Sequence, residues 1–136
     1  MKLYNFNKKE LINIYEKMIT SRLLDDKMLI MLKQGKSWFH IGASGHEASQ
    51  LAASVCFNPE LDYAYPYYRD QAFCLGWGMT TEELLMCFLH KEDDPNSGGR
   101  QMPQHYGSKP LNIVSQSSCT GTQYLQAVGT AFGLQR

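Results

Sequence analysis

Apolar residues at helical spacing predict one long helix at the start of the chain. Asn7, with Glu10 three residues later, has the pattern of a capping box, and Gly35 is a suitable stop. A helix is therefore expected over about residues 8–34, and its length suggests that it packs against a larger body. Its predicted apolar face consists of Ile12, Tyr15, Ile19, Leu23 and Ile30.

Two further pairs of residues have the spacing of a capping box. Ser44 with Glu47 predicts a helix to about residue 56, and Thr80 with Glu83 predicts another one. Helices are also expected over 70–77, where Gly78 follows, and from about residue 122 onward.

Residues 63–66 are expected as a short strand or an extended piece, and residues 111–114 as a strand. Residues 91–110 between the helices contain clusters of glycine and proline and predict a long loop. No internal repeat interrupts this order, so a single domain is expected.

Composition narrows the class of protein. The chain has 136 residues, and its 13 basic and 13 acidic residues give a formal net charge of zero, which argues against a nucleic-acid partner. No apolar run approaches the roughly 20 residues needed to cross a bilayer, and the N-terminus lacks a signal core. The four cysteines show no Cys-x-x-Cys spacing and are expected as free, mostly buried thiols. We therefore expect a cytoplasmic chain with no membrane partner.

Polar segments outside the predicted helices carry the candidate chemistry. Arg69 offers a planar fork of donors and Tyr68 adds a phenol, a combination suited to a phosphate. The alternative for Arg69 is a surface ion pair with Asp70 or Asp62. His105 lies on the glycine-flanked loop, where catalytic groups are common, or it is simply a hydrogen-bonded loop histidine. The hypothesis is a phosphate-bearing cofactor beside a proton-handling group.

The remaining polar clusters give weaker signals. Residues 117–123 precede a predicted helix, where free backbone N–H groups favour an anion, although an ordinary helix start explains them too. His46 and Glu47 are adjacent and would point about 100° apart on a helix, and residues 92–94 lack the spacing of a calcium loop. No metal ligands are therefore expected in this chain. Trp38 and Phe39 are either packing residues or ligand contacts.

Several motifs, taken in order, resemble one family. They are Gly45-His46-Glu47-Ala48, Pro66-Tyr67-Tyr68-Arg69-Asp70, Asp94-Pro95-Asn96, Gly99-Arg100-Gln101-Met102-Pro103-x-His105, Ser117-Ser118 and Gln126-Ala127-Val128-Gly129. This order is similar to the alpha subunit, or the alpha half of a fused chain, of thiamine-diphosphate-dependent 2-oxo acid dehydrogenases. The run that ends in His105 is most similar to the branched-chain (2-oxoisovalerate) members. Residues 121–127 also resemble some bacterial pyruvate dehydrogenases.

The resemblance implies an α/β fold, a parallel sheet flanked by helices that binds thiamine diphosphate, with residues 1–136 as its truncated, helix-rich N-terminal part. It implies oxidative decarboxylation of a branched-chain 2-oxo acid and acyl transfer to the lipoyl group of a partner acyltransferase. A beta subunit or fused beta half and an oligomeric assembly are expected as well. Magnesium would be held beyond Arg136, so the chain alone is expected to be inactive.

The resemblance also assigns roles to single residues. Tyr68, Arg69, Ser118 and Thr120 match cofactor-binding positions, His105 matches a catalytic histidine at the substrate, and Phe39 and Met102 match apolar substrate walls. A pyruvate or acetoin dehydrogenase, or a non-catalytic helical interaction module, are the alternatives. A magnesium motif downstream of Arg136 would separate enzyme from module.

Overall fold

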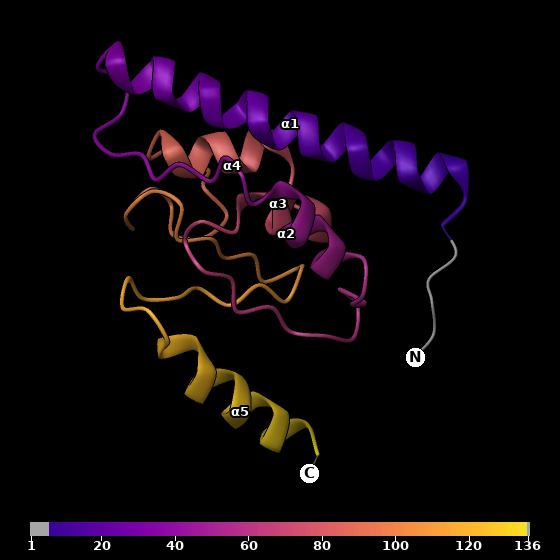
Figure 1. Ribbon diagram of the computed structural model, residues 1–136. Helices are drawn as coiled ribbons and strands as arrows, with labels where there is room; N and C mark the ends of the chain where they lie inside the picture. The colour runs from indigo at the N-terminus through magenta and orange to yellow at the C-terminus, as the bar shows by residue number, and fades with distance from the viewer. Residues whose placement is uncertain (1–5, 136) are drawn as a thin grey trace.

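A computed structural model describes residues 6–135 and shows helices joined by long loops. Figure 1 shows α1 along one side of the molecule, the short helices α2, α3 and α4 beneath it, and α5 on the opposite side, beyond the loops. The helices are α1 (Lys8–Lys33), α2 (Glu47–Ser54), α3 (Gln71–Trp77), α4 (Thr81–Phe88) and α5 (Thr122–Leu134). Among the described residues, no helix is long and apolar enough to cross a membrane.

The predicted start and end of the first helix are confirmed. The Asn7 side chain accepts from the Glu10 N–H at 3.0 Å, and the Glu10 carboxylate accepts from the Asn7 N–H at 2.7 Å, so a capping box starts α1. Past the last helical residue, Lys33, Gly35 has a φ of +70°, which favours glycine and lets the chain turn away.

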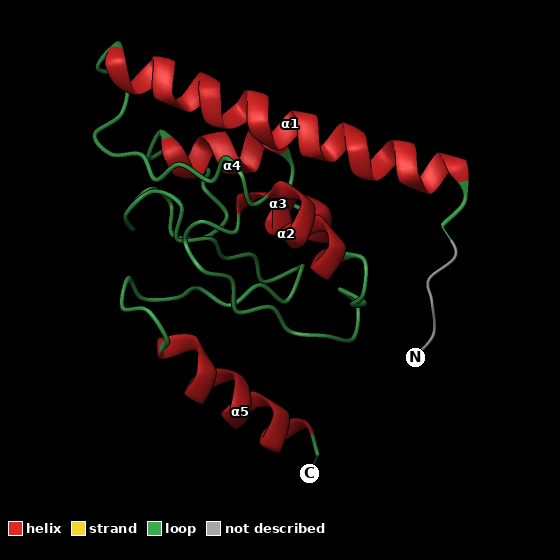
Figure 2. Cartoon of the chain, viewed as in Figure 1, coloured by secondary structure: helices red, strands yellow, loops and turns green. Residues whose placement is uncertain are grey.

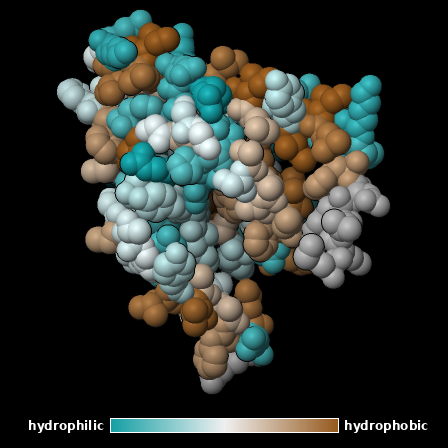
Figure 3. Space-filling view, in the orientation of Figure 1, coloured by the Kyte–Doolittle hydropathy of each residue, from teal (hydrophilic) through white to brown (hydrophobic). Residues whose placement is uncertain are grey.

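The predicted apolar face of α1 is wrong, because its five residues lie in solvent. Tyr15 and Leu23, for example, are 61% and 62% exposed. The buried residues of α1 lie on a neighbouring stripe and are Ser21, Leu24, Asp25 and Met28. Apolar residues occur on several sides of α1, so their period does not reveal which stripe packs. Figure 3 shows apolar side chains exposed over both α1 and α5.

The predicted capping box at the start of α2 is also wrong. Ser44 lies outside the helix and its hydroxyl donates to Asp25 at 2.6 Å. Glu47 is buried, accepts from the Gly45 N–H at 2.9 Å, and forms a bidentate pair with Arg22 at 2.6 and 3.0 Å. Both side chains are thus used in tertiary contacts to α1 and its neighbouring loop, which the local pattern cannot reveal.

The other predicted helices agree with the structure. Thr80 and Glu83 form the expected reciprocal capping box at α4, with N–H to oxygen distances of 2.7 and 3.1 Å. Gly78, with a φ of +137°, ends α3 as expected. α5 begins at Thr122 as expected, but its N-cap is Gly121, which has no side chain to cap the helix.

The two predicted strands form only single bridges. Ala64 pairs in parallel with Ile113, through bonds of 3.0 Å to the Asn112 carbonyl and 2.9 Å from the Val114 N–H. Within residues 6–135 no longer ladder forms, and Figure 2 shows these segments as loops. Pro66, which has no N–H, limits extension of the pairing. The predicted parallel sheet is therefore not confirmed.

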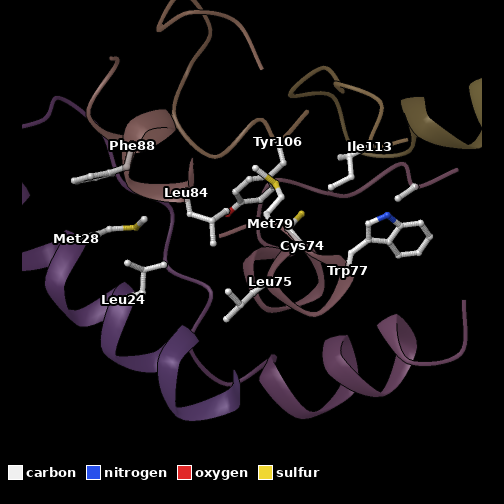
Figure 4. Close-up of a cluster of buried hydrophobic side chains, with 11 residues drawn as sticks. Leu24, Met28, Cys74, Leu75, Trp77, Met79, Leu84, Phe88, Tyr106 and Ile113 are labelled. Carbon is white, nitrogen blue, oxygen red and sulfur yellow. The ribbon is translucent and has the colours of Figure 1, made fainter. Parts of the chain in front are cut away.

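The core lies between α1, α3, α4 and the loops that follow them. Figure 4 shows labelled side chains from these segments turned toward one another, with Tyr106 and Ile113 closing the side opposite α1. The cluster consists of Leu24, Met28, Ala64, Cys74, Leu75, Trp77, Met79, Leu84, Phe88, Tyr106 and Ile113. All four cysteines are free, as predicted. Cys74 and Cys87 are buried, but Cys56 and Cys119 are exposed, so the expectation of buried thiols is wrong for these two.

The helices α2 and α3 approach each other closely at Gly76. A Cβ built there would lie 2.1 Å from the Ser54 Oγ and 2.7 Å from its Cβ. These distances are far below van der Waals contact, so only glycine fits between the two helices at this position.

We predict that Gly76→Ala lowers the free energy of unfolding by about 1–3 kcal/mol, because overpacking must push α3 off α2. Chemical denaturation followed by circular dichroism measures the change. Gly129→Ala is the matched control: nothing lies within 4 Å of its Cβ position on α5, and alanine is the better helix former, so this variant should be neutral or slightly more stable. Equal effects of the two variants would contradict the close packing.

Candidate functional site

Six of the seven site residues predicted from the sequence lie around one cavity of about 220 Å³. The cavity is lined by Phe39, Ile41, Tyr68, Arg69, Met102, His105 and Ser118. These side chains come from four loop segments far apart in the sequence. Larger hollows exist, one of about 500 Å³ beside Lys109 and one of about 320 Å³ beside Gln50, but they contain none of the predicted residues.

Buried polar groups hold the turn that carries Tyr68 and Arg69. The Asp70 carboxylate accepts from the Tyr67 N–H at 2.8 Å, across the turn. The amide nitrogen of Gln50, on α2, donates to the Arg69 carbonyl at 3.0 Å and to the Asp70 carboxylate at 3.1 Å. Burial raises the pKa of Asp70, but the Tyr67 N–H offsets part of that effect. The turn is therefore anchored before α3 begins.

The Arg69 side chain points to the loop that precedes α2. Its Nη1 donates to the Gly42 carbonyl at 2.9 Å, and its guanidinium lies 5.6 Å from the centre of the Tyr68 ring. The alternative prediction, an ion pair of Arg69 with Asp70 or Asp62, is wrong. Asp70 accepts from Tyr67 and Gln50, while Asp62 accepts from the Asn58 N–H at 2.7 Å. Arg69 therefore stands as the cation of the cavity wall.

Two tyrosines with closely packed, tilted rings form one side of the site. The rings of Tyr67 and Tyr68 are 3.8 Å apart, and their hydroxyls are hydrogen-bonded to each other. This bond lowers the pKa of Tyr67 and raises the pKa of Tyr68, because a phenolate formed on one ring would accept from the other. Tyr68 therefore keeps its proton and remains a donor at the cavity wall.

Thr120, the seventh predicted residue, does not line the cavity. Its exposed side chain instead hydrogen-bonds to the hydroxyls of Tyr67 and Tyr68, so it contacts the site through the tyrosine pair. The sequence prediction missed Tyr67, although it is next to Tyr68 in the motif, because a single arginine–tyrosine pair was sufficient to explain the pattern.

His105 is buried in the cavity wall with both ring nitrogens engaged. Its Nδ1 lies 3.1 Å from the Pro103 carbonyl and its Nε2 lies 2.7 Å from the Ser118 hydroxyl. Because a carbonyl can only accept, Nδ1 carries hydrogen, and in the neutral ring Nε2 accepts the Ser118 proton. The ring also stacks on Tyr68, with centres 5.9 Å apart. The two predicted alternatives for His105 therefore hold together: it is a hydrogen-bonded loop histidine, and it also lines the cavity.

The apolar wall includes Ile41, which the sequence prediction missed. Residues 39–43 have no regular secondary structure, and neighbouring side chains of this segment face different parts of the molecule. Phe39 and Ile41 line the cavity, while His40 between them turns toward α1 and lies 3.1 Å from the Asp25 carboxylate. This period of two was the signal that could have found Ile41 from Phe39.

Asp25 holds this wall segment against α1. Besides His40, its carboxylate accepts from the Ala43 N–H at 3.1 Å and from the Ser44 hydroxyl at 2.6 Å. Burial raises the pKa of Asp25, but the hydrogen bonds from His40, Ser44 and Ala43 together outweigh burial and lower it to about 2. The ionised carboxylate is therefore the form that stabilises the fold.

We predict that Asp25→Asn makes the protein less stable at neutral pH and less sensitive to acid. The folded pKa, about 2, lies below the unfolded value of about 3.9, so the stabilisation is complete above pH 4 and is lost as the pH falls toward 2. Over that window the wild type should lose about 2 kcal/mol more of its unfolding free energy than the variant does. Denaturant titrations at several pH values measure this loss.

The control is Asp26→Asn, which removes the neighbouring, exposed carboxylate of α1. It should keep the acid dependence of the wild type. If Asp25→Asn and Asp26→Asn showed the same profile, the buried network would not be the source of the acid sensitivity.

These features define a protein with an arginine, phenol and histidine site built on loops of a helical body. By comparison with known proteins, the chain belongs to the dehydrogenase E1 component family, whose family model matches residues 15–136. The resemblance found in the sequence is thereby confirmed.

The relatives include branched-chain and pyruvate enzymes. The chain is 43% identical to the 2-oxoisovalerate dehydrogenase subunit alpha of Bacillus subtilis, over 90% of the chain and 37% of that protein. It is 36% identical to the mitochondrial 2-oxoisovalerate dehydrogenase subunit alpha 2 of Arabidopsis thaliana, over 91% of the chain and 26% of that protein. It is 33% identical to the pyruvate dehydrogenase E1 component subunit alpha of Staphylococcus aureus, over 93% of the chain and 31% of that protein. The chain therefore spans about a third of the length of these relatives.

Proposed function

We propose that this chain carries part of the thiamine diphosphate and substrate site of a 2-oxo acid dehydrogenase alpha subunit that acts on branched-chain 2-oxo acids. The observation that carries the proposal is the meeting of Arg69, Tyr68, His105 and an apolar wall around one cavity. The family and its 2-oxoisovalerate relatives support the same reaction class.

The donor set of the cavity fits a diphosphate. Arg69 is a permanent cation with a fork of N–H groups, and the Tyr68 hydroxyl lies in the same wall. The Ser118 hydroxyl also lies there, and its proton becomes available to an anion when His105 is protonated at Nε2. No carboxylate is among the residues that line the cavity, so an anion meets no like charge there. Tyr68 keeps its proton and can donate. We assign the diphosphate to this side of the cavity.

The other side of the cavity fits an aliphatic chain. Phe39, Ile41 and Met102 all line the cavity with apolar groups. Phe39 and Met102 are exposed to solvent, whereas Ile41 is buried. Burial of an extra methylene group is worth about 0.8 kcal/mol, so such a wall favours a branched side chain over the methyl group of pyruvate. Pyruvate is the second candidate substrate, since a pyruvate dehydrogenase is among the relatives.

Thiamine diphosphate, when bound, supplies the nucleophilic carbon and the electron sink for decarboxylation. The protein's own contribution is orientation and proton handling. With Nδ1 held by the Pro103 carbonyl, His105 exchanges its proton at Nε2, and the Ser118 hydroxyl orients that atom. A protonated Nε2 would donate to the substrate carboxylate or to a developing negative charge.

Further components complete the proposal. No group of three or more histidine, cysteine, aspartate or glutamate side chains within residues 6–135 is placed to hold a metal ion. As the family resemblance implies, we include magnesium as the ion that accompanies the diphosphate. A beta subunit or fused beta half, a lipoyl-bearing acyltransferase that takes up the acyl group, an oligomeric assembly and a cytoplasmic location belong to the same proposal. A non-catalytic helical module is disfavoured, because it gives no reason for an arginine, a histidine and hydroxyls to share one cavity.

We predict that Arg69→Ala weakens thiamine diphosphate binding by about 10- to 150-fold, because a charge-assisted hydrogen bond contributes roughly 1.5–3 kcal/mol. Calorimetric titration of the complete protein, assembled with its beta subunit, measures the affinity. Arg100→Ala is the matched control, since Arg100 is exposed and donates to the Ser97 carbonyl instead of lining the cavity. Unchanged affinity in Arg69→Ala would remove the diphosphate from this wall.

We also predict that His105→Ala lowers turnover of 2-oxoisovalerate by about 10²- to 10⁴-fold, the usual contribution of a general acid or base. Cofactor affinity should stay near the wild-type value, because Arg69 and Tyr68 remain. Steady-state kinetics at saturating cofactor, together with the same calorimetric titration, separate the two effects. His46→Ala, which removes an exposed histidine, should behave as the wild type. Lost affinity with retained turnover would reverse the assignment.

A further inference from the structure

The side chain of Gln104 forms a two-point bond with the backbone of Ile41. Its Oε1 accepts from the Ile41 N–H, and its Nε2 donates to the Ile41 carbonyl at 2.6 Å. Both residues are buried, and 63 residues separate them in the sequence. A primary amide at this reach satisfies one donor and one acceptor of an extended chain, as a neighbouring strand would.

The backbone of Gln104 is held in an unusual conformation. Its φ is +66°, in the left-handed region where residues other than glycine are uncommon. Such a conformation persists only when the surroundings determine it, and it is found most often at functional sites. The neighbours of Gln104 are Pro103, whose carbonyl holds His105, and His105 itself. The strained residue thus directly precedes the cavity residue His105.

This bond is one of several ties that hold the wall segment. The segment is tied at one end by the Ser37 hydroxyl, which donates to the Phe88 carbonyl at 2.8 Å, and at the other end by Asp25. Between these ties, the recorded hydrogen bonds of the Ile41 backbone, within the part of the chain that the structure describes, are the two to Gln104. Gln104 therefore joins the wall that carries Ile41 to the loop that carries Met102 and His105.

We propose that Gln104 is a positioning residue that fixes the distance between the segment of Ile41 and the loop of Met102. It thereby sets the selectivity of the cavity for branched over short 2-oxo acids. The two hydrogen bonds of Gln104 to the Ile41 backbone, called the clamp below, are observed in the structure. The inference about substrate selectivity rests on the proposed function. Gln104 is not among the residues that line the cavity, so it acts through Ile41.

Three substitutions separate the amide from the shape of the side chain. Gln104→Met keeps the length and volume but removes both hydrogen bonds. Gln104→Glu keeps the acceptor and, when ionised, loses the donor. Gln104→Gly relieves the backbone at positive φ and removes the amide, so it remains informative if the methionine variant does not fold. The control is Gln101→Met, on the same loop, where the side chain is exposed.

The direct readout is hydrogen exchange of the Ile41 amide in the complete protein, compared with the wild type at equal pH. We expect exchange about tenfold faster in Gln104→Met and Gln104→Gly, as loss of a hydrogen bond of typical strength implies. Gln104→Glu retains the acceptor and should exchange more slowly than Gln104→Met, and Gln101→Met should match the wild type. Wild-type exchange in Gln104→Met and Gln104→Gly would overturn the clamp.

The second readout is the ratio of kcat/KM for 2-oxoisovalerate to that for pyruvate in the assembled enzyme. We expect Gln104→Met to lower this ratio about tenfold while thiamine diphosphate affinity, measured by calorimetry, is unchanged. Faster exchange with an unchanged ratio would overturn the selectivity role. A wild type that turns over neither acid would overturn the proposed function and the selectivity role with it, and the exchange rates would still decide the clamp.

Discussion

The buried carboxylate of Asp25 is the interaction on which the arrangement of the site depends. It sits on the inner stripe of α1 and accepts from His40, from the Ala43 N–H and from Ser44. The segment from residue 37 to residue 44 has no regular secondary structure, so its backbone position must come from such tertiary bonds. A buried carboxylate is costly unless its oxygens are satisfied, and here three groups satisfy them.

Two parts of the cavity follow from the position of this segment. His40 turns toward Asp25, while its neighbours Phe39 and Ile41 line the cavity. The Gly42 carbonyl from the same segment then accepts from Arg69. The cation and the apolar wall are therefore placed by one anchor on α1. A separate bidentate pair, between the half-exposed Arg22 and the nearly buried Glu47, ties α2 to α1.

The sequence predicted best where structure is determined locally. The boxes at Asn7 and Thr80 and the glycine stops need only neighbouring residues, and they agree with the structure. The prediction was wrong where a residue distant in the sequence determines the hydrogen bonds of a side chain. Ser44 and Glu47 have capping spacing, but Asp25 and Arg22 bind their side chains more effectively than the helix end does.

The same distinction applies to the site. The family resemblance selected residues of which six meet around one cavity, and these six lie on loops that line it. Tertiary pairs such as Gln104 with Ile41 have no local signature, since the amide and the backbone it bonds are 63 residues apart. The packing stripe of α1 was unpredictable for a related reason: its apolar residues occur on several sides, and only the tertiary structure selects one.

The dimensions of the cavity bear on how the proposed enzyme would be assembled. At about 220 Å³ it is smaller than the roughly 300–1,000 Å³ of typical ligand sites, and Phe39 and Met102 remain partly exposed at its surface. A diphosphate and a short aliphatic chain need walls on more sides than these loops provide. Apolar side chains are also exposed along α1 and α5, and exposed apolar surface of this kind is typical of protein contacts. In the proposed enzyme, the missing walls would come from protein packed against these loops, so excluding water from His105 and completing the assembly would be one and the same event.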